Sequence, residues 1–300
     1  MPTSRKQILD YYKSPGLMTS PGKYAKELRK LPRDVGELAK IVQGLGIHQF
    51  VAEPFYGVPI SEERLENESH IRRLDGLLGG ILALKDQPLS IPRKPEQRLA
   101  GVCHHFAVLL VGMLRARGVP ARSRYGFGDY FNPGFYEDHS LCEYWNAKEK
   151  RWVLVDPQFD QYWQKNVKHD VLDVPRDHFL VAGEPWIRCR KEELDPSKFG
   201  IFNGNLRGLW FVAGSIVKDL AALNKMELLQ WDAWGARAPR PNNRMQDKKR
   251  LRFFDELAKL IAADPDASFD KLRRLYKEKK NRLVVPDRVF NAGRGHLEYI

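Results

Sequence analysis

The segment Gly101–Pro120 constrains the fold of this chain more than any other part of its sequence, because it reads as one buried helix with marked ends. Apolar residues recur with helical spacing from Phe106 to Leu114, and alanine and valine make the opposite side apolar as well. A helix that is apolar around its whole circumference is buried. Gly118 suits the left-handed position after the last turn, and Pro120 prevents continuation. The rest of the chain must therefore supply a core around this helix.

The composition of the chain permits such a core. The chain has 300 residues, of which 43% are hydrophobic and 29% are charged. A chain of this length buries most of the surface that it exposes when unfolded. These proportions are typical of a globular protein and exclude a disordered, collagen-like or coiled-coil chain.

Helices are predicted before the central helix, and strands after it. Apolar residues at helical spacing predict helices over Arg33–Leu45 and Ser61–Lys85. Short runs bounded by turn residues predict strands over Arg122–Phe127, Asp138–Trp145 and Arg151–Pro157. We therefore expect an α+β protein in which the central helix packs on an antiparallel sheet, with helical N-terminal and C-terminal extensions.

The last third returns to helical patterns and is basic. Helices are predicted over three segments: Leu206–Gln230, Asp247–Ala262 and Ser268–Lys280. Between Asp247 and Arg282 the sequence has 12 Lys or Arg and 7 Asp or Glu. We expect a core domain over residues 1–182, including the N-terminal helices. Residues 183–300 are expected to form a mainly helical, basic region with a linker at 236–243.

Cys103 stands at the beginning of the central helix, where a thiol is suited to act as a nucleophile. A helix N-terminus has unpaired N–H groups and about half a positive charge, which favours the thiolate over the thiol. Gly101 lets the backbone approach closely, and the Cys103 amide is placed to donate to a developing oxyanion. Burial as an ordinary core thiol is the alternative.

The hairpin after the helix offers a histidine and a carboxylate on one face. We expect Asp138–Trp145 to pair with Arg151–Pro157 through a loop at Asn146–Glu149. In that register His139 lies opposite Asp156, with Cβ atoms ~5 Å apart. A carboxylate there fixes the imidazole tautomer while the other ring nitrogen addresses the thiol. A slip of one residue would abolish this arrangement.

Three segments resemble the core of the transglutaminase-like superfamily as found in bacteria: GVCHHFAVLLVGMLRARGVPARSRYGF, DHSLCEYW and RWVLVDPQ. The resemblance extends over roughly Leu74–Gln158 and implies a papain-like fold with a Cys, His, Asp triad and no cofactor. It makes Cys103 the nucleophile, His139 the general base and acid, and Asp156 the orienting carboxylate. Leu141 stands where many relatives have an aromatic residue, so their substrate preference does not transfer.

The other cysteines and histidines are interpreted as structural. Cys142 alternates with His139 along the strand and points to the opposite face. Cys189 is interpreted as a surface or core thiol. His104 and His105 point about 100° apart on a helix and match no zinc pattern, so no metal site is expected.

Weaker candidates accompany the triad. Gln97 lies six residues before Cys103 and is a candidate oxyanion donor, or else a solvated side chain. Glu143 shares the strand face of His139 and either supports the site or pairs with an arginine. Four aromatic residues fall in the expected loop Gly128–Tyr136: Tyr130, Phe131, Phe135 and Tyr136. They are expected to line an acyl-substrate groove or form a lid, or else to pack against the N-terminal helices.

Charge supports a competing interpretation. The 50 Lys and Arg outnumber the 38 Asp and Glu, and a formal charge of +12 favours anionic partners. The first hypothesis is a thiol-dependent acyl-transfer enzyme that acts on a protein, peptide or small amide. The second is an inactive scaffold that binds an anionic partner, such as nucleic acid, through the basic C-terminal helices. Acidic residues interrupt those helices and no nucleic-acid motif is present, so nucleic-acid binding is the weaker expectation.

The chain is expected to be cytoplasmic and without a membrane partner. Its three cysteines form no CxxC pair, which argues against a disulfide scaffold or a Cys-rich zinc site. The N-terminus lacks the continuous apolar run of a signal peptide. No stretch reaches the roughly 18 apolar residues of a membrane span.

Overall fold

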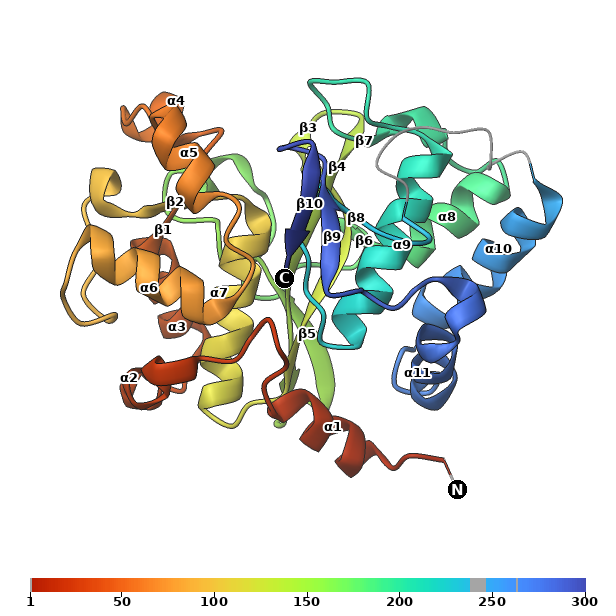
Figure 1. Ribbon diagram of the computed structural model, residues 1–300, viewed down its shortest axis with the longest axis horizontal. Helices are drawn as coiled ribbons and strands as arrows, with labels where there is room; N and C mark the ends of the chain where they lie inside the picture. The colour runs from red at the N-terminus through yellow and green to blue at the C-terminus, as the bar shows by residue number, and fades with distance from the viewer. Residues whose placement is uncertain (1, 238–246, 263) are drawn as a thin grey trace. The chain divides into compact units, whose positions relative to one another are not determined.

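The computed structural model describes residues 2–237, 247–262 and 264–300 and is drawn as a ribbon in Figure 1. The chain divides into two compact units, each assembled from separate stretches. The first, here called the Cys103 unit, comprises Leu9–Ser123 and Leu141–Val174. The second, the His139 unit, comprises Met1–Ile8, Arg124–Ser140 and Pro175–Ile300. The latter unit takes residues from both sides of position 182, and the domain division predicted there stays a prediction.

Helices dominate the N-terminal part of the chain. Their bounds are α1 (Arg5–Lys13), α2 (Ala25–Lys30), α3 (Val35–Leu45), α4 (Ala52–Tyr56), α5 (Glu62–Glu68), α6 (Leu74–Leu84) and α7 (Cys103–Ala116). Helix α3 begins where the Asp34 side chain accepts a hydrogen bond from the Glu37 amide. Ser61 caps α5 in the same way. Gly118 follows α7 with a φ of 78°, the left-handed conformation that its position predicts.

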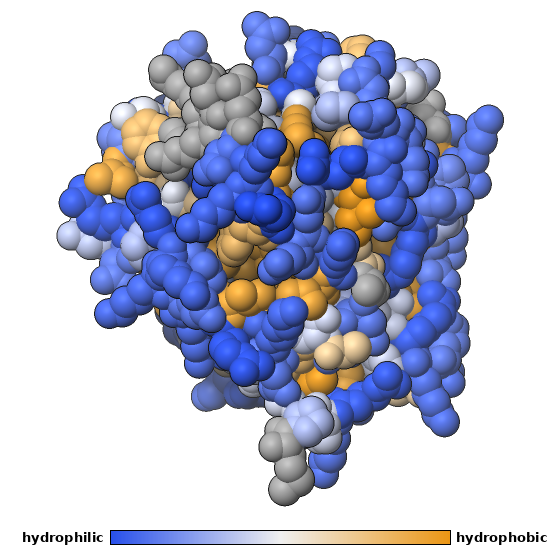
Figure 2. Space-filling model, turned by 90° about the vertical axis from the view of Figure 1, so that its right-hand side faces the viewer, coloured by the Kyte–Doolittle hydropathy of each residue, from blue (hydrophilic) through white to orange (hydrophobic). Residues whose placement is uncertain are grey.

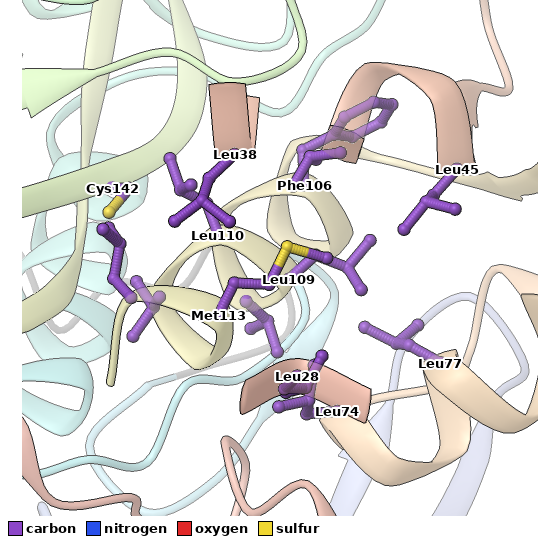
Figure 3. Packing of buried hydrophobic residues seen from close by; sticks show 14 of the residues in the cluster. Leu28, Leu38, Leu45, Leu74, Leu77, Phe106, Leu109, Leu110, Met113 and Cys142 are labelled. Atoms are coloured by element: carbon purple, nitrogen blue, oxygen red, sulfur yellow. The ribbon is translucent and has the colours of Figure 1, made fainter. Parts of the chain in front are cut away.

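Helix α7 is the centre of the Cys103 unit, as its apolar circumference predicts. Every residue from Cys103 to Arg115 is buried. Helices α2, α3 and α6 pack against it. Their leucines meet Leu109, Leu110 and Met113 in one apolar cluster (Figure 3). The core of this unit is therefore built around a single helix.

The single helix predicted over Ser61–Lys85 is wrong, because α5 ends at Glu68 and α6 begins only at Leu74. The Glu68 carboxylate turns inward and accepts a hydrogen bond from the Ala100 amide. A buried charge-assisted bond of this kind fixes the end of the helix. Helical periodicity carries no sign of it, since its partner lies 32 residues away.

Strands β3 (Ala121–Asn132) and β4 (Phe135–Asn146) are longer than predicted. Only Pro133 and Gly134 connect them, and Gly134 has a φ of 72°. Proline and glycine together suit a tight turn of this kind. The expected loop Gly128–Tyr136 is therefore wrong, because most of its residues belong to the two strands.

Strand β4 pairs antiparallel with β5 (Arg151–Val155) in a register that differs from the prediction. Glu143 lies opposite Leu154, whereas the predicted register places it opposite Trp152. The predicted pairing is therefore wrong by two residues. Because side chains alternate between the faces of a strand, a shift of two leaves each residue on its predicted face.

The turn between the two strands sets this register. Asn146 pairs with Arg151, and its side chain accepts hydrogen bonds from the amides of Lys148 and Glu149. Lys150 completes the turn with a φ of 55°. Asparagine suits such a turn because its side chain bonds to the backbone two residues on. The loop consequently begins one residue later than predicted.

The sheet continues in the hydrogen-bonded order β5-β4-β3-β6, and β7 pairs with β4. In the His139 unit, β6 is antiparallel to β3, and β7 is parallel to β4. A further sheet has the order β10-β9-β8. The bounds are β6 (Phe179–Val181), β7 (Phe199–Gly200), β8 (Asp232–Ala233), β9 (Arg288–Asn291) and β10 (His296–Tyr299). The sequence analysis missed these strands because runs of two to four residues carry no periodic signal. A short parallel pair, β1 (Gly46–His48) with β2 (Leu99–Gly101), belongs to the Cys103 unit.

The helices of the C-terminal part are α8 (Gly183–Arg190), α9 (Leu209–Leu223), α10 (Lys248–Ala262) and α11 (Phe269–Lys277). Helices α8, α9 and α10 pack on one another, and α11 packs on α9. The side of the molecule shown in Figure 2 is largely hydrophilic, with apolar residues in separate patches. Most of the predicted linker at 236–243 lies outside the described residues. In the part of the chain that the structure describes, no helix has the length and apolar character to cross a membrane.

Leu110→Ala tests the central place of α7. Leu110 is fully buried in the apolar cluster. Removing its side chain loses burial and leaves a cavity, so we expect the free energy of unfolding to fall by about 3 kcal/mol. Urea unfolding followed by far-UV circular dichroism measures this loss. Leu297→Ala, at a side chain that is 51% exposed, is the control, and equal losses in both variants would contradict this account of the core.

Candidate active site

Cys103 is the first residue of α7 and is 5% exposed. Strand β2 leads directly toward it, and Val102 between them is extended. The thiol therefore belongs to the first turn of a buried helix. This is the end at which the backbone N–H groups of a helix have no partner within the helix.

Polar contacts fix the strand that leads to Cys103. The Glu68 carboxylate accepts a hydrogen bond from the Ala100 amide at 2.6 Å. Arg64 donates to both oxygens of that carboxylate, at 2.6 and 2.9 Å. Glu68 is buried, and charge-assisted bonds of this bidentate kind are strong. The backbone before Cys103 is therefore held in one position.

Gln97, the candidate oxyanion donor, ends the short 3-10 helix η2 (Pro95–Gln97) and is half-buried. Arg64 donates to the carbonyl groups on either side of it, to Glu96 at 3.3 Å and to Arg98 at 2.7 Å. The backbone around Gln97 is thus tied to the same arginine as the strand before Cys103. Its role as an oxyanion donor stays a prediction.

The His105 side chain forms a hydrogen bond with the backbone at the start of α7. Its Nδ1 accepts a hydrogen bond from the Val102 amide at 3.0 Å. Burial lowers the pKa of His105 to about 4, so its ring is neutral at pH 7. A Cβ at Gly101 would lie 2.6 Å from Cγ of His105, and glycine is therefore required where the chain turns into the helix. Within residues 2–237, 247–262 and 264–300, no group of three or more His, Cys, Asp or Glu side chains is arranged to hold a metal ion.

His139 lies in β4 and is 2% exposed. Aromatic rings surround its imidazole within the His139 unit. The distance between ring centroids is 4.9 Å to Phe131, 6.2 Å to Tyr130 and 6.0 Å to Phe179. A Cβ at Gly128 would lie within 3.0 Å of both the Tyr130 and the Phe131 rings, so glycine admits these rings to the space beside it. A histidine in such surroundings has few rotational alternatives.

The four aromatic residues predicted near the histidine divide into two pairs. Tyr130 and Phe131 contact the His139 ring, as described above. Phe135 packs against Phe202, with ring centroids 5.4 Å apart. Tyr136 stacks on Phe199 at 4.5 Å. Their proposed contact with a substrate stays a prediction for all four.

Asp156 follows the last residue of β5 and is 1% exposed. Its amide donates to the Val171 carbonyl at 2.8 Å. Its carboxylate accepts a hydrogen bond from the Gln158 amide at 3.4 Å. The backbone of Asp156 is therefore anchored outside the β4–β5 ladder.

The observed register changes the pairing predicted for the triad. One step beyond the last pair, Cys142 with Val155, Asp156 falls opposite Leu141. The predicted position of Asp156 directly opposite His139 is therefore wrong. Alternation along β4 places His139 on the same face as Leu141.

The two remaining cysteines are buried and free. Cys142 belongs to the apolar cluster of the Cys103 unit, as its opposite facing predicts (Figure 3). Burial raises the pKa of Cys142 far above the ordinary value of a thiol. Burial also raises the pKa of Cys189, to about 11. Neither thiol is suited to react at neutral pH.

Glu143 forms a buried ion pair. Its carboxylate accepts from Nε of Arg122 at 2.6 Å, and the two side chains are 0% and 1% exposed. The Arg122 guanidinium also lies 3.9 Å from the Trp152 ring centroid and 4.9 Å from that of Tyr12. Of the two roles left open by the sequence, pairing with an arginine is the one that the structure contains.

Glu137 is a titratable neighbour of His139 that the sequence analysis missed. Its carboxylate accepts hydrogen bonds from the Asn132 side chain at 3.0 Å and from the Phe202 amide at 3.2 Å. Burial raises the pKa of Glu137 to about 7. It stands two residues before His139 in β4, so the alternation of the strand was the signal that would have found it.

Comparison with known proteins defines the class of the central segment. Residues 86–157 match the family model described as the transglutaminase-like superfamily, and this range contains Cys103, His139 and Asp156. A protein-glutamine gamma-glutamyltransferase of Pseudomonas aeruginosa is 27% identical over 119 residues. This alignment covers 34% of the present chain and 18% of the Pseudomonas protein. This segment is therefore similar to the transglutaminase-like superfamily, and the alignment spans less than a fifth of the length of that relative.

Two solved structures are also similar to the chain. The periplasmic domain of TgpA from Pseudomonas aeruginosa has a TM-score of 0.31 and 19% identity, covering 55% of this chain and 54% of that one. A Cytophaga hutchinsonii protein assigned as a cysteine protease has a TM-score of 0.27 and 15% identity, covering 60% of this chain and 46% of that one. The class of the segment rests on the family model and the curated relative.

Glu137→Gln tests the environment of the His139 strand. Because burial raises the pKa of Glu137 from 4.5 to about 7, the folded protein binds more protons than the unfolded chain between these values. The wild-type protein therefore loses stability from this group as the pH rises through that interval. The variant lacks this titration, so its urea midpoint should fall less between about pH 5 and about pH 7.5. Glu149→Gln, at a side chain that is 50% exposed, should follow the wild type, and parallel curves for Glu137→Gln would contradict the assignment.

Proposed function

We propose that the protein is a thiol enzyme that acts on a carboxamide or peptide bond through a thioester on Cys103. The observation that carries this proposal is the position of Cys103 in the first turn of α7, inside the segment that matches the transglutaminase-like family model. The triad of Cys103, His139 and Asp156 is part of the proposal. Its support is the order of the three residues, their burial and their place within the matched range.

In the first half of the proposed reaction, the Cys103 thiolate attacks the carbonyl carbon of the amide. The helix N-terminus, with the Cys103 amide, stabilises the negative charge that develops on the carbonyl oxygen. The C–N bond then breaks, and the His139 imidazolium gives its proton to the departing amine. The products of this half are a free amine and a thioester on Cys103.

In the second half, water or another amine attacks the thioester. His139 takes a proton from the attacking group, and the C–S bond breaks to restore the thiolate. Asp156 stabilises the imidazolium and holds its tautomer. Water yields hydrolysis, whereas an amine yields transfer, and both share every step up to the thioester. A protein, peptide or small amide is the proposed substrate class.

Alkylation of the folded protein tests the nucleophile. Mild iodoacetamide treatment near neutral pH, followed by peptide mass spectrometry, should label Cys103 well before the other thiols. Burial raises the pKa of both Cys142 and Cys189, which slows their alkylation. His139→Ala should slow the labelling of Cys103 roughly tenfold or more, since the thiolate then lacks its imidazole partner. Unfolding in urea should remove the selectivity.

Enzyme activity is measured on the same protein samples, together with a control variant. Incubation with glutamine peptides and a labelled amine distinguishes transfer, seen as incorporated label, from hydrolysis, seen by mass spectrometry as conversion of glutamine to glutamate. Cys103→Ala should abolish both, and Cys142→Ala is the matched control that should retain them. Three equally slow thiols, together with activity that survives Cys103→Ala, would defeat the proposal.

A second candidate function is binding of an anionic partner by the C-terminal helices. A hollow of about 730 Å³ is lined by Lys271, Arg274 and Lys277 together with Pro2 and Asp270. The Asp270 carboxylate is occupied by the amide and hydroxyl of Thr3, at 2.8 and 2.5 Å. With Arg273, four basic residues therefore line the hollow while its acidic residue is engaged, which favours a phosphate-bearing partner.

Binding of fluorescein-labelled single-stranded RNA, followed by anisotropy at several salt concentrations, tests this second candidate. Lys271→Glu with Arg274→Glu should weaken binding by at least about tenfold, and wild-type affinity should fall steeply with salt. Glu149→Lys adds a positive charge in the Cys103 unit and serves as the control for net charge. Binding that ignores salt, or that survives the double substitution, would eliminate this candidate.

A further inference from the structure

Residues of the C-terminal part of the chain form polar contacts with the strand that carries His139. Asp138 and Ser140 flank His139 in β4, and their side chains lie on the opposite face by alternation. Lys218 of α9 donates to both oxygens of the Asp138 carboxylate at 3.2 Å. The Gln230 side chain donates to Oγ of Ser140 at 3.2 Å. Both neighbours of the histidine are therefore held by residues outside the segment that matches the family model.

The contact between Asp138 and Lys218 is a fully buried ion pair. Their side chains are 0% and 1% exposed. The Ser215 hydroxyl, one turn earlier in α9, also contacts Asp138 at 3.2 Å. The Lys218 ammonium lies over the Tyr125 ring at 5.4 Å and over the Phe211 ring at 5.8 Å. The charges of this pair are thus compensated by each other and by groups of the same unit.

A second buried pair fixes the neighbouring strand to the same helix. Arg124 of β3 donates to both carboxylate oxygens of Asp219, at 3.0 and 2.9 Å. Asp219 also accepts a hydrogen bond from the Tyr125 amide at 2.8 Å. Lys218 and Asp219 are consecutive, so one turn of α9 binds both β3 and β4. The relative position of these strands around His139 therefore depends on that turn.

Burial of a charge pair is a poor way to gain stability. Desolvation of the two ions offsets their attraction, and an apolar pair of the same size is often equally stable. Stability alone therefore does not explain why this ion pair is present, whereas a role in positioning does. The pair fixes where the Asp138 carboxylate lies and cancels its charge beside the histidine.

We propose that Lys218 is a positioning residue for His139 that acts through Asp138. The inference rests on the proposed function, in which His139 exchanges protons with the substrate. Lys218 holds β4 against α9 and neutralises the carboxylate adjacent to the histidine. The imidazole then keeps its position among Tyr130, Phe131 and Phe179. It gains and loses its proton next to an Asp138 carboxylate whose charge Lys218 neutralises.

This role predicts opposite effects for the two members of the pair. Without Lys218, the Asp138 carboxylate keeps the attraction of Arg237 but loses its ion-pair partner, so more net negative charge lies next to His139 and favours the imidazolium. Without Asp138, an uncompensated ammonium disfavours it. Neighbouring charged or titratable groups of the His139 unit are the same in both variants, among them Arg124, Tyr125, Tyr130, Glu137, Asp219, Asp232 and Arg237. A difference between the variants therefore reports on the pair itself.

The test is an NMR titration of the histidine rings in the full chain, with His139 assigned from the spectrum of His139→Gln. In Lys218→Met the pKa of His139 should rise by about one pH unit, and in Asp138→Asn it should fall by a similar amount. The double variant, Lys218→Met with Asp138→Asn, should return to within about 0.3 pH units of the wild type. Arg190→Met breaks a half-exposed ion pair with Asp255 in the same unit and should leave the titration unchanged.

Folding is checked by near-UV circular dichroism for each variant. Lys218→Gln keeps a donor for Asp138 while removing the charge, so it provides the measurement if Lys218→Met does not fold. An unchanged pKa of His139 in Lys218→Gln and Asp138→Asn, or shifts in the same direction in both, would overturn the inference. The titration needs no turnover, so it is independent of the alkylation experiment. The pKa of His139 could shift as expected while His139→Ala leaves the rate of Cys103 labelling unchanged. That combination would defeat the enzyme proposal but leave the coupling between the pair and His139 intact.

Discussion

The way the chain turns into helix α7 is the constraint on which the candidate active site depends. A thiol gains from the helix dipole only in the first turn, so the residues just before Cys103 must reach that turn in one conformation. Strand β2 supplies it through its pairing with β1 and through the Glu68 carboxylate on the Ala100 amide. Gly101 lets the chain pass His105, whose ring takes up the Val102 amide. The apolar cluster around α7 then keeps the helix itself from moving.

Buried charge is used differently in the two units. In the Cys103 unit, Arg64 and Glu68 bind backbone groups of the segment that leads to Cys103. In the His139 unit, α9 binds carboxylates and amides of the strands around the histidine. In both cases a charged side chain orders main chain beside a proposed catalytic residue. The apolar core supplies stability, whereas these pairs supply position.

Much of this arrangement could be predicted from the sequence, because its signals are local. The all-apolar helix, its Gly118 end, the Cys103 start and the alternation along β4 each follow from the residues in one short stretch. The errors share a different origin. Glu68 breaks a predicted helix for a partner that is distant in sequence, and Asn146 moves a turn by one residue through its own side chain. Lys218 lies in a mostly apolar helix, and the sequence alone does not show that Asp138 is its ion-pair partner.

The boundary between the two units falls directly after Ser140, one residue past His139. The chain also passes from one unit to the other inside β3 and again after Val174. The transglutaminase-like segment therefore does not form one compact unit by itself in this protein. A gene truncated after that segment would encode all three proposed catalytic residues. It would lack α9 and β7, which contact the histidine strand β4, and β6, which pairs with β3. Such a shortened chain would keep His139 but lose the contacts of Lys218 and Gln230 with the residues on either side of it.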